Sequence, residues 1–383
     1  MNGNKLVAAC IADIHMYDKN AWPLLEELRS EFLEPLRKMG NKLDAVFILG
    51  DLFHGKVSMN GAAASAVLQF MNELADITEP RDITVRVLKG TATHDHSMLN
   101  ALSFLGARGI EVYNDVTTED IEVFIKGVLY EFSILYLPEE YPKDWREYYG
   151  NVLPPRDGIP YDIILGHGMV DFAAFSSLLL ESERPIKSAV VFPTDLLVRS
   201  GTVSVFGHVH VAQSNKSVHY CGSFSRIAFG EEQPKGWLLL EMDAETSAVR
   251  ITRKRNKKAP EYRTLSIFEV MQEDEEAESA LEKIGPILEK SRLRLTVDSE
   301  VSPEMSSKIS VLREHFSGDD RFRIERRLLK KKTVSEGAED DGLDFVRKKE
   351  LPVDETIHRH ISGNKPNLGI TLEDVRGVIS PKR

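Results

Sequence analysis

The sequence predicts an α/β fold, and two observations support this prediction. Short apolar runs rich in Val and Ile alternate with amphipathic runs from residue 1 to about 255. His and Asp side chains follow directly after several of the apolar runs. Short apolar runs bounded by Gly, Asp or Pro are typical of buried strands. Strands that alternate with helices build a layered α/β core.

The elements of this region follow from the spacing of apolar residues. Buried strands are expected at residues 6–11, 45–49, 83–88, 163–165 and 202–206. Residues 24–39 and 61–74 carry apolar side chains at a spacing close to 3.6 and predict helices. Later strands are expected to form antiparallel meanders, around residues 121–126, 132–137, 237–241 and 248–252.

A second unit, residues 258–332, predicts a small α+β domain. Its expected order is strand, helix, strand, helix, strand, at residues 262–267, 273–288, 292–297, 303–316 and 322–330. The central strand, RLRLTV, alternates basic and apolar side chains, so one of its faces is buried and the other solvated. An acidic linker follows at 333–344. The tail, residues 345–383, has too few apolar side chains for its own core, so it is expected either to be loosely ordered or to fold on a partner.

The composition indicates the cellular compartment in which the protein is expected to reside. The only cysteines are Cys10 and Cys221, which do not make a disulfide framework and indicate a reducing compartment. No apolar run approaches the roughly 20 residues that span a bilayer. The apolar N-terminal run leads into polar motif residues and predicts a strand, not a signal peptide. We therefore expect a cytoplasmic protein without a membrane segment, in the host cytoplasm if the source is viral.

Charge is unevenly distributed along the chain. The net charge of −11 argues against a surface coated with phosphate-binding side chains. However, residues 250–263 and 321–332 each carry seven basic side chains against one Glu. Such stretches can bind a polyanion, or they can be solvated strand edges that Lys protects from aggregation. Together with the site described next, they favour a role in binding.

Five separate segments place His or Asp at predicted strand ends. The carboxyl ends of the strands in an α/β sheet lie along one edge, so five segments can deliver side chains to one place. Carboxylates and imidazoles together suit Mn, Fe or Zn better than Mg or Ca. The segments contain Asp13 and His15, Gly50 to His54, Gly90 to Asp95, Gly166 to Gly168, and Gly207 to His210.

This ordered series resembles the motifs of the calcineurin-like metallophosphoesterase family: D-x-H, G-D, G-N-H-D, G-H and G-H-x-H. The resemblance implies a four-layer sandwich over residues 1–257, with two mixed sheets flanked by helices. It also implies two divalent metal ions, which we expect to be Mn²⁺. The first would be held by Asp13, His15, Asp51 and His210, and the second by the bridging Asp51 with His167 and His208.

The third motif departs from the family. The resemblance implies that His94 stabilises the transition state or protonates the leaving oxygen, and that Asp95 orients His94. The family has an Asn before this His that binds the second metal, whereas this chain has GTATHD with Thr93 at that place. A water molecule in the vacant position, a contact from Thr93, or a weakened second metal are the possible outcomes.

Other features are similar to the SbcD branch of the family, whose members are DNA repair and recombination nucleases. His54 in GDLFH adds a histidine that acts near the substrate phosphate in that branch; the alternative is a loop histidine without a role. The stretch from Tyr220 to Trp237 looks like the one that follows the last motif of SbcD. Residues 258–332 have the position and size of the DNA-capping domain, and 345–383 the position that binds the SbcC-like ATPase.

The sequence therefore predicts a metal-dependent DNA nuclease that works with an SbcC-like ATPase of the SMC type and forms a homodimer, as its relatives do. Exonuclease activity is expected, and endonuclease activity could accompany it. One alternative is a phosphodiesterase or phosphatase acting on small substrates. Another is a catalytically impaired scaffold, which the missing Asn would favour.

Overall fold

A computed structural model describes residues 4–95, 98–154, 158–174, 190–272, 274–289, 291–298, 301–319 and 321–327. The chain divides into two compact units, Met1–Leu328 and Leu329–Arg383. The expected linker 333–344 and tail 345–383 lie outside the described residues. The boundary expected at residue 257 stays a prediction.

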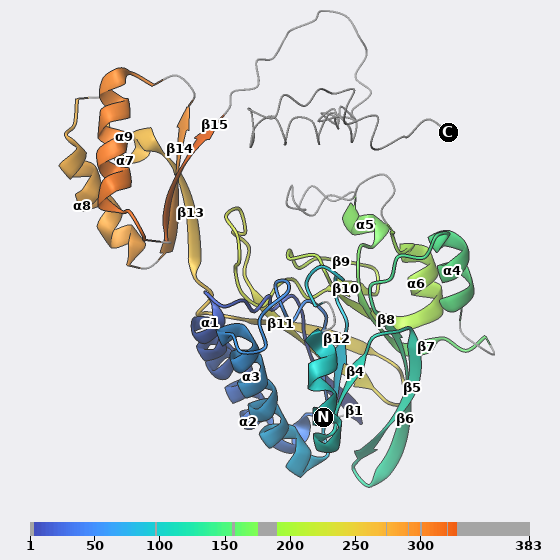
Figure 1. The fold of residues 1–383 in the computed structure, drawn as a ribbon. Helices are drawn as coiled ribbons and strands as arrows, with labels where there is room; N and C mark the ends of the chain where they lie inside the picture. Colours follow the sequence, from blue (N-terminus) through green and yellow to red (C-terminus); the bar gives the residue numbers. More distant parts are fainter. Residues whose placement is uncertain are drawn as a thin grey trace, which may run out of the picture. The chain divides into compact units, whose positions relative to one another are not determined.

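Two six-stranded mixed sheets form the centre of the first unit (Figure 1). In the first sheet four parallel strands are extended by an antiparallel pair at one edge. Its strands, in spatial order, are β12 (Val249–Arg255), β11 (Gly236–Asp243), β1 (Lys5–Ile11), β2 (Ala45–Leu49), β3 (Thr84–Leu88) and β4 (Ile110–Tyr113). The order of the second sheet is β5 (Thr117–Ile125), β6 (Val128–Leu137), β7 (Tyr161–His167), β8 (Gly201–Gly207), β10 (Val218–Tyr220) and β9 (Ser214–Asn215).

Helices cover the outer face of each sheet, as Figure 1 shows. The first sheet is covered by α1 (Ala21–Leu28), η1 (Arg29–Leu33), α2 (Glu34–Met39), α3 (Ala62–Thr78) and η4 (Met98–Arg108). The short turns η2 (Gly40–Lys42) and η3 (Glu79–Arg81) follow α2 and α3 and bury no residue. The second is covered by α4 (Trp145–Val152), α5 (Asp171–Ala174) and α6 (Thr194–Ser200). None of the helices in the described ranges combines the length and apolar character needed to cross a bilayer.

Three cores hold these layers together. Strand β1 shows how: Ala9 and Ile11 pack toward the helices, whereas Ala8 and Cys10 pack between the two sheets. Because successive side chains alternate between faces, a strand buried on both sides is apolar throughout. The predicted four-layer sandwich of two mixed sheets flanked by helices is therefore confirmed.

The helix expected at 24–39 is present but contains a π-helical turn, η1. Pro35 lies in the first turn of α2 and lacks the N–H that a continuous α-helix would use. The π turn accommodates the missing hydrogen bond, so α1 and α2 run on as one rod.

One expectation about strand pairing was only half right. Strand β6 pairs antiparallel with β5, as expected, but its other edge pairs parallel with β7. The carboxyl end of β6 therefore lies at the same sheet edge as the end of β7. This places the residues after β6 beside the predicted metal ligands.

A third sheet has its own core. It is parallel throughout, in the order β13 (Glu261–Ser266), β14 (Ser291–Asp298) and β15 (Phe322–Arg327). Its helices are α7 (Ile267–Val270), α8 (Ala277–Leu288) and α9 (Pro303–His315). Leu293, Leu295 and Val297 pack toward these helices, and Arg292 and Arg294 alternate with them, as the RLRLTV pattern predicts.

Candidate metal centre

The predicted ligands converge where strands of both sheets end. Asp13 and His15 follow β1, Asp51 follows β2, His167 ends β7, and His208 follows β8. The loops are tied together by backbone hydrogen bonds: the N–H of Asp13 donates to the carbonyl of Gly50, and that of His15 to the carbonyl of Asp51. The two sheets thus bring distant segments to one place, as the sequence predicts.

The backbone at this place is strained. Asp13, His15, Asp51 and His208 all have positive φ, at 50°, 52°, 52° and 91°. A non-glycine residue in this region costs on the order of 1–3 kcal/mol and tends to occur where function requires it. Gly90 has no room for a side chain, because a Cβ there would lie 2.2 Å from the backbone nitrogen of Asp51. The loop that contains Gly90 therefore packs closely against the loop that contains Asp51.

One group of side chains surrounds the first predicted metal position. Ligand atoms of Asp13, His15 and His210 lie within 4.8 Å of one another. The Nε2 atoms of His15 and His210 are 2.9 Å apart. Asp13 accepts the backbone N–H of His208, which fixes its carboxylate. All three residues were predicted as ligands of one ion.

A buried ion pair orients His210. The Nδ1–H of His210 donates to Glu231, 2.8 Å away, which leaves Nε2 facing His15. Lys235 lies 3.2 Å from the same carboxylate, and neither side chain of this pair is exposed. Burial would raise the pKa of Glu231, but His210 and Lys235 hold it below its ordinary value. Such a carboxylate fixes the tautomer of a histidine ligand.

The second group gathers around His167. Its Nδ1–H donates to the carbonyl of Leu49, so Nε2 points into the site. The His208 ring lies 5.3 Å from the His167 ring, at 83°. Burial and the neighbouring His167 lower the pKa of His208 to about 4, which keeps it in the neutral form that binds metals.

Asp51 lies between the two groups. Its Oδ2 atom is 3.8 Å from Nε2 of His15, in the first group, and 3.4 Å from Nε2 of His167, in the second. Its Oδ1 accepts the backbone N–H of Thr91 at 2.6 Å. This is the position that a bridging carboxylate requires.

The family model for calcineurin-like phosphoesterases matches residues 6–212. The chain belongs to this family. The described fold and the clustered His and Asp side chains agree with a phosphoesterase that uses divalent metal ions. The comparison with curated proteins gives no match.

Solved structures similar to this phosphoesterase include GAP50, the anchor in the inner membrane complex of Plasmodium. It is 13% identical, with 66% of this chain and 89% of that chain covered and a TM-score of 0.40. A hypothetical protein from Thermus thermophilus is 13% identical, with 65% and 100% covered and a TM-score of 0.34. A protein of unknown function from Aquifex aeolicus is 19% identical, with 43% and 78% covered and a TM-score of 0.20.

The donor set fits divalent cations. Burial raises the pKa of Asp13 to about 6, while Asp51 has a pKa well below its ordinary value because His167 and His94 outweigh the effect of burial. The charged form of Asp13, which burial disfavours, would be stabilised by a cation bound beside it. Asp13, His15, Asp51 and His210 would hold one ion, and Asp51, His167 and His208 would contribute to the second.

His94 lies beside Asp51, the predicted bridging carboxylate. Its Nδ1–H donates to Oδ2 of Asp51 at 2.8 Å, and this hydrogen bond raises the pKa of His94. About 30% of its side chain is exposed, so Nε2 is the ring atom available to a substrate oxygen. This position is compatible with proton donation to a leaving group, although that role stays a prediction.

Asp95 contacts the backbone of the loops that carry the predicted site residues. Its buried carboxylate accepts the backbone N–H groups of Asp51, Phe53 and Gly90, at 3.0, 3.1 and 2.8 Å. Burial and the neighbouring Asp51 raise its pKa to about 7. Asp95 thus fixes the two loops that carry Asp51 and His94. Its direct orientation of the His94 ring stays a prediction.

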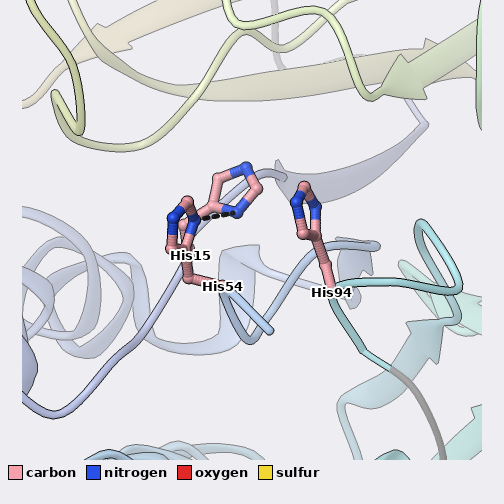
Figure 2. Close-up of side chains that lie close together, drawn as sticks. All are labelled: His15, His54 and His94. Carbon is pink, nitrogen blue, oxygen red and sulfur yellow. Dashed lines mark hydrogen bonds between the residues drawn. The ribbon is translucent and has the colours of Figure 1, made fainter. Parts of the chain in front are cut away.

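His54 joins the cluster from the loop after β2. Figure 2 shows its ring beside those of His15 and His94. Its Nδ1 lies 3.3 Å from Nδ1 of His15, and its ring stacks on His94 with centroids 5.5 Å apart. Ligand atoms of the three histidines lie within 4.8 Å of one another. His54 is therefore close enough to act at the site.

Three residues near the ligands were missed as functional residues. Glu231 and Lys235 lie within the stretch from Tyr220 to Trp237, for which the sequence shows only an overall resemblance and indicates no role for either residue. Glu139 was not singled out, because the strand before it was expected to form only an antiparallel meander. The order Leu-Pro-Glu-Glu after an apolar strand was the available signal.

The GTATHD loop places Thr91, not Thr93, toward the ligands. The Thr91 hydroxyl lies 3.2 Å from Oδ2 of Asp51 and 3.3 Å from Nε2 of His167. Thr93 is exposed. The contact considered for Thr93 is therefore made by the threonine two residues earlier.

Proposed function

We propose that this phosphoesterase is a DNA nuclease that hydrolyses phosphodiester bonds with Mn²⁺ and works with an SbcC-like ATPase. We propose exonuclease activity, with endonuclease activity as an accompanying one. The observation that carries the proposal is a cavity of about 500 Å³ with basic and aromatic side chains in its wall. Its wall includes Tyr17 from the loop of His15, and Tyr262 and Arg292 from the third sheet.

The cavity begins next to the metal centre. Tyr17 follows His15 by two residues, and its ring centroid lies 5.4 Å from that of His54. A polymer in the cavity would therefore reach the histidine cluster past a single aromatic ring. A small phosphate ester would need no such extension of the site.

The solvated face of the third sheet continues this surface. Arg294 and Arg323 lie over the ring of Phe229, with guanidinium carbons 5.0 and 4.4 Å from its centroid. Arg292 lies over Tyr262 at 5.7 Å, and Phe229 packs against Tyr262 at 5.0 Å. Guanidinium groups bind phosphates, and aromatic rings stack on bases. This combination is typical of nucleic-acid surfaces.

The charge of the cavity wall is mixed. Lys19, Lys258 and three arginines face it, together with Glu26, Glu27 and Glu289. The guanidinium of Arg226 donates to the backbone carbonyls of Glu231, Ala259 and Pro260, so this arginine stabilises the cavity wall. A modest excess of positive charge predicts weak, salt-sensitive DNA binding. A partner that also binds DNA would compensate for this.

The chain supplies the groups that phosphodiester hydrolysis needs. Bound divalent ions would polarise the phosphoryl group and activate a water molecule. His94 would donate a proton from Nε2 to the leaving oxygen, a role that accelerates reactions by about 10²–10⁴-fold. His54, stacked on His94, would contact a phosphate oxygen beside it.

A comparison of two substrates tests the proposal. Duplex DNA and bis-p-nitrophenyl phosphate would be hydrolysed by the same metal centre, but only DNA would use the third sheet. The double variant R294A/R323A is expected to lose at least about tenfold in DNA hydrolysis and to keep its activity on the small ester. R37A is the matched control, because Arg37 lies on α2, outside both basic stretches, with 42% of its side chain exposed.

The opposite outcome would identify the alternative function. Activity on the small ester with none on DNA, even with an SbcC-like ATPase present, would indicate a small-substrate phosphodiesterase. The ATPase and the homodimer stay predictions, since the tail expected to bind the ATPase lies outside the described residues.

A further inference from the structure

Glu139 lies at the edge where the second metal ion is expected. It follows β6 by two residues, and Pro138, which has no N–H to donate, separates it from the strand. Strand β6 runs parallel to β7, with Leu137 opposite Gly166, the residue before His167. The carboxyl ends of the two strands therefore carry Glu139 and His167 side by side.

We propose that Glu139 is a ligand of the second metal ion and takes the place of the amide that the GTATHD loop lacks. Ligand atoms of Glu139, His167 and His208 lie within 4.8 Å of one another. With the bridging Asp51, these residues give four protein ligands. The inference rests on membership of the phosphoesterase family and not on DNA as the substrate.

The bonding of Glu139 supports this role. Its Oε2 atom is buried and has no hydrogen-bond partner among the described residues, while the carboxylate as a whole also interacts with the Tyr141 hydroxyl, and burial together with this carboxylate raises the pKa of that tyrosine. A buried carboxylate oxygen without a donor is costly unless a cation or water binds it. The neighbouring Glu140 differs, because its Oε2 accepts the Tyr148 hydroxyl at 2.6 Å. Of these two adjacent glutamates, only Glu139 joins the histidine group.

The other candidates for this position are less suited. Thr93 is exposed. The backbone N–H of Thr91 donates to Oδ1 of Asp51, and its hydroxyl lies near Oδ2. A neutral hydroxyl is a weaker donor to a divalent ion than a carboxylate. A glutamate from a different strand thus supplies what the third motif does not.

The substitution changes the chemistry of the site. A carboxylate adds a negative charge that an amide does not have, so the second ion is held by two carboxylates and two imidazoles. More oxygen and more charge among the ligands suit Mn²⁺. The second site is therefore complete and does not depend on the third motif.

Manganese binding to the full-length chain tests this inference. Metal-free protein is titrated with Mn²⁺, and bound ions are counted by calorimetry and by the electron paramagnetic resonance signal of spin-coupled manganese pairs. The unmodified chain is expected to bind about two ions. The E139A variant is expected to keep the first ion at unchanged affinity, to bind the second at least about tenfold more weakly, and to lose the pair signal.

The matched control is E140A, which removes the adjacent carboxylate and is expected to bind both ions like the unmodified chain. An E139A protein that binds two ions with unchanged affinities would overturn the proposal. If E139A does not fold, a Mn²⁺-soaked crystal of the unmodified chain decides the point. A manganese ion with a Glu139 oxygen roughly 2 Å away supports the proposal, and an ion bound at His167 without Glu139 contradicts it.

Discussion

Replacing Lys235 with methionine is expected to destabilise the fold strongly. The Lys235 ammonium lies 3.2 Å from Glu231 with neither side chain exposed, and it donates to the His210 carbonyl at 3.0 Å and to the Ser223 hydroxyl at 2.7 Å. Methionine fills a similar volume but leaves the Glu231 charge buried beside one histidine. Removing one partner of a buried pair costs about 3–5 kcal/mol.

The free energy of unfolding is measured by urea denaturation, followed by circular dichroism. Chelator is present throughout, because a bound ion would add its own stabilisation. The expected loss of about 3–5 kcal/mol corresponds to a fall of roughly 4 to 6 °C in Tm for a chain of 383 residues. The double variant E231Q/K235M removes both charges and is expected to recover part of the loss.

Lys216 offers the matched control. It pairs with Asp195 at 2.7 Å, but 56% and 81% of the two side chains are exposed. K216M is therefore expected to cost less than about 1 kcal/mol. If K235M is as mild as K216M, or if the double variant is as unstable as K235M, the buried pair does not hold His210 in the way described.

Three further predictions follow from the site and its surroundings. H94A is expected to lose about 10²–10⁴-fold in kcat while still binding both ions. H315A, a change on the exposed face of α9, is expected to match the unmodified chain in kcat and in metal binding. G90A is expected to weaken Mn²⁺ binding, because its Cβ would lie 2.2 Å from the backbone nitrogen of Asp51. In the control G106A the new Cβ would meet nothing within 4 Å, so this variant is expected to bind Mn²⁺ like the unmodified chain. Equal affinities for Mn²⁺ in the two variants would contradict the prediction. Burial raises the pKa of Glu27 from 4.5 to about 7, so between these pH values the folded state keeps a proton that the unfolded state has released, and the free energy of unfolding falls by roughly 3 kcal/mol as pH rises through this window. E27Q is expected to be more stable than the unmodified chain at pH 8 and to lose this part of the pH dependence. Parallel stability profiles for the two proteins would contradict the assignment.

The layered fold could be predicted because its signals are local. Each parallel strand of the first sheet is buried on both faces, and this leaves a short apolar run in the sequence. The motif histidines and aspartates follow such runs, so their convergence at one sheet edge follows from the α/β architecture alone. Asp13, His15, Asp51, His167 and His210 were all placed in this way.

The pairing between strands leaves weaker signals in the sequence than the burial of a strand does. Nothing local in residues 128–137 shows that one edge of β6 is antiparallel and the other parallel. The position of Glu139 depends on that second pairing, which is why its proximity to His167 appears only in the structure. The same holds for Glu231 and Lys235, because a buried ion pair cannot be distinguished from surface charges by spacing.

The central claim is that the chain is a metal-dependent phosphoesterase with two ions at one site. The most direct test titrates metal-free protein with Mn²⁺ while hydrolysis of bis-p-nitrophenyl phosphate is followed. Hydrolysis is expected to be absent without metal and to reach its maximum at about two ions per chain. Hydrolysis that persists in chelator, or saturation below about one ion per chain, would contradict the claim.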